Sequence, residues 1–218
     1  MERKNTIPKF PESYLGDKAE EYEDSKSMER NQKKTTLMSI QYLFDEKLNN
    51  LGNKDFLKEK QYLILDLGCG TGFSTEILLQ KGFRVIGVDL LTDMISKAVI
   101  KKQFLPSVKK LEYLLADINF LPIRNNSIDH IISISTYNFI TYGKEGFRER
   151  SKTVNNSAKY LHKVIKFNGR IIIEFYPKDE EELNLFISSF INNGFNGFMI
   201  KNKPHQKAGQ TFLLLKKC

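Results

Sequence analysis

Residues 62–73 read YLILDLGCGTGF, an apolar run that ends in an acidic residue and three alternating glycines. A run this short and this rich in leucine and isoleucine is typical of a strand buried in a parallel sheet. The glycines remove the Cβ atoms that would keep backbone amides away from a ligand, and residues 74–79 have the composition of a helix that begins there. We therefore expect a strand, a loop with free N–H groups and a helix N-terminus.

The spacing of the glycines separates two kinds of nucleotide-binding loop. Nicotinamide and flavin sites use Gly-x-Gly-x-x-Gly, whose third glycine would fall where this chain has Phe73. The spacing present is Asp-x-Gly-x-Gly-x-Gly, which resembles the first motif of class I S-adenosylmethionine-dependent methyltransferases. The resemblance implies a cofactor loop made of Asp66, Gly68, Cys69, Gly70, Thr71 and Gly72.

Two further predicted strands also end in acidic residues. Residues 84–88 lead to Asp89, about 20 residues beyond the glycine loop, where nucleoside-binding α/β units place the acceptor for the ribose hydroxyls. Residues 111–116 lead to Asp117. We predict that Asp89 and its neighbour Leu90 bind the ribose, and the family resemblance places Asp117 and Ile118 at the adenine. The alternative for each acid taken alone is that it caps the helix that follows.

The length and composition favour one domain. The 218 residues suffice for a single α/β core, in which residues 1–60 form a helical leader and residues 61–218 the methyltransferase domain. No uncharged apolar stretch approaches 18 residues and no signal segment is present, so we expect a cytoplasmic protein without membrane contact. Two cysteines, at positions 69 and 218, and three scattered histidines predict no metal site.

The net charge of +8 is unevenly distributed. Residues 1–60 hold 12 basic and 12 acidic side chains, so the rest of the chain carries the whole excess. The densest basic stretches are residues 97–110, 144–170 and 201–217. They predict a basic face for a polyanion such as RNA. The alternative is an ordinary solvated surface that happens to be rich in lysine.

Apolar runs and turn signals predict a seven-stranded sheet. We expect strands at residues 62–67, 84–89, 111–116, 128–135, 170–176, 197–202 and 210–216. The fold class is α/β, a Rossmann-like, mostly parallel sheet with an antiparallel last strand and helices on both faces. We expect a helical leader from Asp17 to about Asn49, and a helix at residues 153–166 that Asn168 and Gly169 terminate.

The end of the fourth strand carries information on the reaction. Residues 133–136 read SIST, which is unlike the proline-rich motif that exocyclic-amine methyltransferases place there. Carbon-5 pyrimidine methyltransferases need a cysteine nucleophile outside the glycine loop, and neither cysteine qualifies. The reaction that these exclusions leave is transfer to a lone pair that needs no general base, such as that of a purine ring nitrogen.

Residues 137–150 interleave aromatic rings with cations, a pattern that suits stacking of the rings on a nucleobase. Packing of Tyr137 and Phe139 in the core is the alternative.

Over nearly its whole length the chain resembles small-subunit ribosomal RNA guanine-N(7) methyltransferases and their archaeal relatives. The leader pattern from Pro11 to Gln32, residues 133–135 and the Tyr176-Pro177 pair carry this resemblance. It implies S-adenosylmethionine as cofactor, with Ser133 at its site, and ribosomal RNA as substrate. It also implies that Asn138, Phe139 and Tyr176 position the substrate.

The same resemblance implies a protein partner. Family members form a heterodimer with a small zinc-binding methyltransferase activator, which adds a strand to the edge of the sheet, here residues 109–116. The chain departs from the family at Asn138 and Phe139, where a Gln-Trp pair is usual, and at Ser27, where an arginine is usual. It ends at Cys218 without the long basic tail of eukaryotic members, which favours an archaeal-type relative.

Three alternatives stay open on this reading. The chain could be a small-molecule methyltransferase of the same fold. It could instead be a ribosome-assembly factor whose presence rather than activity is required. The exposed strand edge could also be covered by the chain's own leader rather than by a partner.

Overall fold

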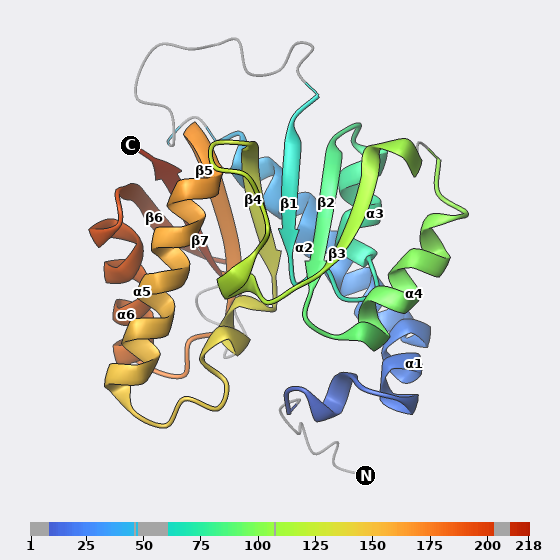
Figure 1. Cartoon of the computed structure of the whole chain (residues 1–218), viewed down its shortest axis with the longest axis horizontal. Helices are drawn as coiled ribbons and strands as arrows, with labels where there is room; N and C mark the ends of the chain where they lie inside the picture. Colours follow the sequence, from blue (N-terminus) through green and yellow to red (C-terminus); the bar gives the residue numbers. More distant parts are fainter. Residues whose placement is uncertain (1–8, 46, 48–60, 107, 203–209) are drawn as a thin grey trace.

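The computed structural model describes residues 9–45, 47, 61–106, 108–202 and 210–218, except for the side chain of Asn138. Figure 1 shows a central twisted sheet with helices in front of and behind it. The N-terminal segment, blue in Figure 1, lies beneath the carboxyl ends of strands β1 and β2. In open α/β sheets this is the edge at which ligands bind.

Seven strands form one sheet in the order β3-β2-β1-β4-β5-β7-β6. Neighbours from β3 to β5 pair in parallel, and β7 pairs antiparallel with both β5 and β6. The bounds are β1 Leu63–Leu67, β2 Arg84–Asp89, β3 Leu111–Leu115, β4 Ile128–Ile134, β5 Ile165–Phe175, β6 Phe195–Lys201 and β7 Thr211–Lys217. The predicted α/β fold with an antiparallel last strand is confirmed.

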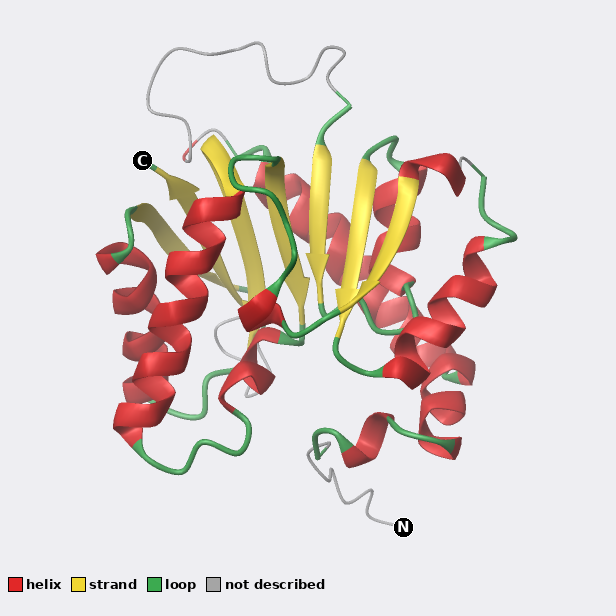
Figure 2. Cartoon of the chain, viewed as in Figure 1, coloured by secondary structure: helices red, strands yellow, loops and turns green. Residues whose placement is uncertain are grey.

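Helices cover both faces of the sheet (Figure 2). On one face α2 (Lys26–Leu43) and α3 (Phe73–Gln80) pack on a cluster that includes Ile64 and Ile132. On the other face α5 (Phe147–Val164) and α6 (Glu180–Asn192) pack on a cluster that includes Leu65 and Ile131. Since neighbouring strand residues point to opposite cores, a slip of one residue would place each side chain in the wrong layer, so the register is well specified.

Two helix boundaries differ from the prediction. The helix predicted at 153–166 is α5, which begins six residues earlier, at Phe147, and ends at Val164, and Asn168 and Gly169 do not cap it. They belong to β5, which begins at Ile165 because this residue pairs with Ile128 across an irregular register. Asn168 has φ 61°, and a Cβ on Gly169 would lie 2.7 Å from the Asp129 carbonyl oxygen. The turn signal therefore marks a distortion inside a strand.

The leader is two helices rather than one. α1 (Asp17–Asp24) ends at Ser25, whose hydroxyl accepts a hydrogen bond from the Met28 amide and so caps the start of α2. The leader helix was predicted to reach about Asn49, but α2 ends at Leu43, with Phe44 as its C-cap. None of the helices in the described part of the chain is long and apolar enough to cross a membrane.

Candidate functional site

The glycine loop between β1 and α3 is tight, and its backbone explains the three glycines. Gly68, Gly70 and Gly72 have φ of 71°, 55° and 92°, a region that disfavours side chains. A Cβ on Gly68 would overlap the side chain of Thr136, whereas a Cβ on Gly70 would meet nothing closer than the Tyr22 hydroxyl at 3.9 Å. The loop therefore leaves open space above Gly70, where a ligand can approach the backbone.

The amides of Gly68, Cys69, Gly70 and Gly72 are not free, contrary to the prediction. The N–H groups of Gly68 and Cys69 donate to the Val88 carbonyl, and that of Gly72 donates to the Cys69 carbonyl. The Gly70 amide donates to Oδ2 of Asp89 at 2.9 Å. Recognition of a ligand at this loop consequently depends on side chains and on shape more than on a nest of amides.

Asp89 at the end of β2 borders the cavity and holds the loop from below. Its Oδ1 accepts from the Leu91 amide at 3.0 Å and its Oδ2 from Gly70, so each oxygen retains one lone pair for a further donor. Burial raises the pKa of its carboxyl, which the same backbone amides partly counteract. A pair of neighbouring ligand hydroxyls fits this acceptor set, and Leu90 beside it is half-exposed.

Asp117 lies at the end of β3, where its carboxylate accepts from the Asn119 backbone amide at 2.8 Å and caps a short 3-10 helix (Ile118–Phe120). The capping alternative is thus correct for this acid, and the residue also borders the cavity with Ile118. Phe120 at the end of this turn is 80% exposed, an apolar ring at the rim.

Four predicted cofactor residues lie behind the site rather than on its wall. The cavity lining does not include Asp66, Thr71, Gly72 or Ser133. Asp66 is fully buried and accepts from the Ser74 hydroxyl at 2.6 Å, and burial raises its pKa to about 7. Ser133 is also buried, and its hydroxyl donates to the Leu67 carbonyl because strand alternation turns it away from the opening. These residues shape the loop from beneath.

The cavity has a volume of about 1300 Å³ and unites segments far apart in sequence. The loop contributes Gly68, Cys69 and Gly70, the ends of β2 and β3 contribute the acids described above, and the ends of β4 and β5 contribute polar and aromatic side chains. The leader forms the remaining wall. The predicted residues Phe139 and Tyr176 therefore share one cavity with the acids, whereas the side chain of Asn138 lies outside the described part.

The leader closes the cavity with aromatic rings. Tyr22 stacks on Phe73 at 5.9 Å and meets Tyr14 edge-on at 5.8 Å, and both tyrosines border the cavity. Burial raises the pKa of both phenols, so the hydroxyls are neutral hydrogen-bonding groups. A helical leader was expected from the sequence, but these two rings were not assigned to the site.

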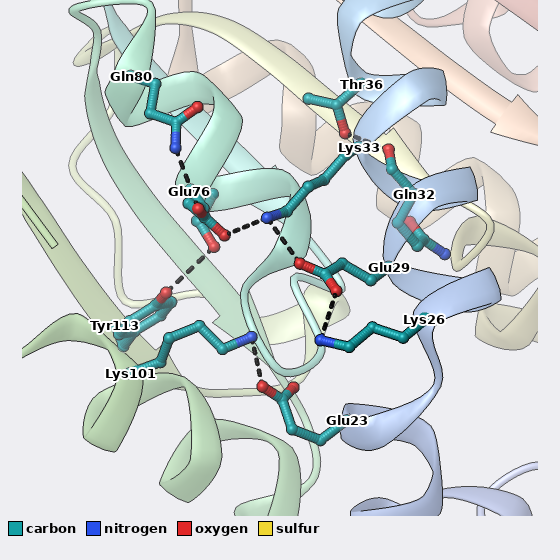
Figure 3. A network of polar contacts seen from close by, with 11 residues as sticks. Glu23, Lys26, Glu29, Gln32, Lys33, Thr36, Glu76, Gln80, Lys101 and Tyr113 are labelled. Carbon is teal, nitrogen blue, oxygen red and sulfur yellow. Dashed lines mark hydrogen bonds and ion pairs between the residues drawn. The ribbon is translucent and has the colours of Figure 1, made fainter. Parts of the chain in front are cut away.

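Ion pairs fasten the leader to the sheet domain (Figure 3). Lys33 of α2 lies 2.9 Å from Glu29 and 2.8 Å from Glu76 of α3. Lys101 of α4 (Thr92–Lys102) lies 2.6 Å from Glu23 of α1 and 4.0 Å above the centre of the Phe73 ring. The leader is thus positioned over the glycine loop by charge as well as by packing.

At the end of β4, Phe139 projects toward the leader. Its ring stacks on Phe10 with 4.9 Å between centroids and a 20° angle between planes, and it meets Tyr14 edge-on at 5.8 Å. Tyr137 is instead fully buried, and its hydroxyl pairs with Ser157, so the core alternative is correct for this ring. Phe139 is only partly buried and presents a face that accepts a flat ring.

At the end of β5, sequence reasoning missed a buried carboxylate. Glu174 is fully buried yet borders the cavity. Its oxygens accept from the hydroxyls of Ser135 and Tyr176 and from the side-chain amide of Gln210. Gln210 also donates to Thr35 of the leader at 2.8 Å, a contact between residues 175 positions apart. Only the folded chain assembles this polar network.

The predicted basic face is weaker than its charge count implies. Arg170 and Lys217 are buried, and the Lys217 ammonium donates to the His162 and Ile165 carbonyls. Several others pair with acids, among them Lys97 with Glu20. The cations that border the cavity are Lys34, Lys144 and Lys178.

The cysteine in the glycine loop is unsuited to nucleophilic attack. Burial and then the neighbouring carboxylates raise the pKa of the Cys69 thiol well above its usual range, which leaves little thiolate. Within the described ranges no group of three His, Cys, Asp or Glu side chains could hold a metal ion. The site offers acceptors, aromatic faces and an enclosed volume, which together suit binding and alignment of two ligands.

Comparison with known proteins identifies the family. Residues 65–173, half of the chain, match the family model described as "Methyltransferase domain". A curated relative, the 18S rRNA (guanine(1575)-N(7))-methyltransferase of Saccharomyces cerevisiae, is 27% identical over 200 residues, which are 90% of this chain and 66% of the relative. The chain thus spans just under two thirds of the length of such relatives.

A second relative and a solved structure complete the comparison. The malonyl-[acyl-carrier protein] O-methyltransferase of Hamiltonella defensa is 44% identical over 132 residues, 59% of this chain and 49% of the relative. The structure of Haemonchus contortus phosphoethanolamine N-methyltransferase 2 in complex with S-adenosylmethionine superposes with a TM-score of 0.64 at 12% identity, covering 84% of this chain and 52% of that one. The chain therefore belongs to the methyltransferase-domain family, and its fold is that of the class I S-adenosylmethionine-dependent methyltransferases.

Proposed function

We propose that the protein transfers a methyl group from S-adenosylmethionine to N-7 of a guanine in small-subunit ribosomal RNA. The observation that carries this proposal is a single cavity lined both by strand-end carboxylates and by the partly buried ring of Phe139, on which another flat ring, that of Phe10, already stacks. The names of relatives such as the yeast enzyme support the choice of substrate.

The residues present fit the cofactor. Asp89 has acceptor capacity for two ribose hydroxyls, and Asp117 with Ile118 provides an acceptor beside an apolar surface for the adenine. The open backbone at Gly70 admits the rest of the molecule under the Tyr22 ring. When bound, S-adenosylmethionine would supply a methyl group on a sulfonium sulfur to an acceptor lone pair, and S-adenosylhomocysteine would be the product that leaves.

The proposed acceptor atom, N-7 of guanine, suits a site in which no group is assigned as a general base. N-7 of guanine carries a lone pair and no proton, so a general base has nothing to remove. The Cys69 thiol is unsuited to attack, and residues 133–136 lack the groups that hold an exocyclic amine. Alignment of two bound ligands in an enclosed site can lower a barrier by as much as ~7–11 kcal/mol. The task of this chain is therefore to bind, orient and exclude water.

The decisive test is to map N-7-methylguanine in small-subunit ribosomal RNA from cells without the gene. We expect one methylated guanine to disappear, to return with the wild-type gene and not to return with Asp89→Ala. Unchanged methylation in the deletion strain would refute the proposal. Normal ribosome assembly with Asp89→Ala, despite lost methylation, would show that presence and activity are separate roles.

One observation favours a different acceptor. The 44% identity over 132 residues is the higher of the identities to the two curated relatives given above, and the name of that relative, a malonyl-[acyl-carrier protein] O-methyltransferase, points to an oxygen of a carboxylate as acceptor. A buried glutamate on the cavity wall would repel such an acceptor, which favours RNA. Turnover of a malonyl thioester at a rate independent of salt, without transfer to ribosomal RNA, would establish the alternative, since binding to RNA weakens steeply with salt.

A small zinc-binding activator is the partner that we propose for β3. This strand is the edge of the sheet, and Leu115 on it is 50% exposed. The Ala116 amide donates to the Asp89 carbonyl, so by alternation the amides of Tyr113 and Leu115 point away from β2. An added strand from a partner would satisfy them.

A further inference from the structure

Glu174 is a buried acid that the proposed transfer to N-7 leaves without a role. It lies at the carboxyl end of β5, is fully shielded from solvent by the surrounding chain and borders the cavity. Its hydrogen-bond donors are the hydroxyls of Ser135 and of Tyr176, the latter at 2.7 Å, and the Gln210 amide at 3.0 Å. A carboxylate buried in this way is costly unless donors surround it.

The chemistry of a carboxylate restricts what it can recognise. It accepts hydrogen bonds through about four lone-pair positions and donates none. Guanine presents two adjacent donors, N1–H and the N2 amine, on the edge remote from N-7. Adenine presents an acceptor at N1 and has no amine at C2. Two of the groups now on Glu174 are hydroxyls, which can rotate to other acceptors when a ligand supplies its own donors.

The same cavity already holds a flat ring, which is stacked on Phe139. Phe10 of the leader stacks on Phe139 at 4.9 Å, with the two planes 20° apart. Both rings border the cavity that Glu174 also borders. A base could replace Phe10 on this face, because stacking of a base on an aromatic ring tolerates any base and leaves its edge free to be read.

We propose that Glu174 selects guanine by accepting hydrogen bonds from N1–H and N2–H of the target base while Phe139 stacks on its face. This inference rests on the proposed function and names the residue that would enforce it. Methylation at N-7 places positive charge on the purine and makes N1–H more acidic. The carboxylate therefore binds the base more tightly in the transition state than before transfer, which is the condition for catalysis.

The test uses mononucleotides, so it does not depend on knowing the RNA site. Dissociation constants of guanosine, inosine and adenosine 5′-monophosphate are measured by calorimetry with S-adenosylhomocysteine present. For the wild type we expect guanosine monophosphate to bind roughly 10-fold more tightly than inosine monophosphate, which lacks the N2 amine, and adenosine monophosphate to bind more weakly still. In Glu174→Gln the preference for guanosine over inosine monophosphate should fall below ~2-fold, because the charged acceptor is gone.

A matched control is Glu182→Gln, which alters a buried glutamate that is not part of the cavity lining. It should retain the wild-type preference. The wild-type measurement alone can overturn the inference: equal affinity for guanosine and inosine monophosphate, or no binding of either, excludes a carboxylate reading that edge. Methylation of ribosomal RNA without this preference would refute only the role of Glu174. A guanine preference without ribosomal RNA methylation would refute only the proposed function.

Discussion

The carboxylate of Asp89 accepts a hydrogen bond from the amide of Gly70 at 2.9 Å, which joins the end of β2 to the middle of the glycine loop. The two residues lie 19 positions apart and share one wall of the cavity. The acid thus has two tasks in the proposed function, since it would bind the ribose hydroxyls and it fixes the loop beside them.

Asp89→Ala should weaken binding of S-adenosylmethionine by roughly 2–4 kcal/mol, because two charge-assisted hydrogen bonds to the ribose are lost. Isothermal calorimetry measures the effect directly. Glu112→Ala serves as the control, since Glu112 is an exposed acid on β3 that is not part of the cavity lining. Wild-type affinity in the Asp89 variant would exclude this acid as the ribose acceptor.

Phe139→Ala should reduce methyl transfer by roughly 1–3 kcal/mol in activation free energy and leave cofactor affinity unchanged, because the ring stacks on the target base. Phe139→Trp should retain activity. Phe10→Ala is the informative control: Phe10 occupies the ring face that a base would use, so its loss should leave transfer at or above the wild-type rate. Equal losses of cofactor binding and transfer in Phe139→Ala would instead indicate a packing role.

The position of the acids proposed to bind the cofactor could be predicted because parallel strands bring their carboxyl ends together. Asp89 and Asp117 each follow an apolar run, and both border the cavity as expected. Ser133 lies in β4, near its carboxyl end, but its orientation depends on strand alternation within the folded sheet, which directs the hydroxyl to the Leu67 carbonyl. Likewise, the amides of Gly68, Cys69 and Gly70 donate to Val88 and Asp89 of the neighbouring strand β2, a contact that no local pattern reveals.

Glu174 was missed for a related reason. Glu174 has no distinctive spacing from the other motifs, and its partners come from the segments that follow β4 and β5 and from the segment before β7. The Asn168-Gly169 pair was misread because the same residues terminate helices and distort strands. Pairing of Ile165 with Ile128 decides between the two outcomes, and it is a tertiary contact.

His130 should make the folded state sensitive to acid. Its ring is buried, its Nδ1 accepts from the Arg170 amide at 3.2 Å, and burial lowers its pKa to about 4. Since the unfolded chain binds the proton with a pKa of about 6.5, stability is present at neutral pH and is lost as the pH falls toward 4. The loss between pH ~7 and ~4.5 should be roughly 2–3 kcal/mol.

His130→Gln provides the comparison, because its side-chain oxygen can accept from the same amide and does not titrate. Urea unfolding of both proteins at the two pH values gives the difference. Asp66, whose pKa is raised to about 7, titrates in both proteins and cancels. Identical losses of stability in the two proteins would contradict a buried neutral imidazole.

The edge of β3 allows a test of the partner without damage to the glycine loop. Tyr113 is unsuitable as a target, because its hydroxyl pairs with Thr75 and its ring lies beneath Gly87. Leu115→Pro removes one outward-pointing amide, at an edge position where proline is tolerated. It should abolish co-purification with a co-expressed zinc-binding activator and leave cofactor affinity in place. Leu115→Ala, which loses the same side chain and keeps the amide, should still co-purify. If both variants retain the activator, or if wild-type protein never captures it, strand addition at this edge is wrong.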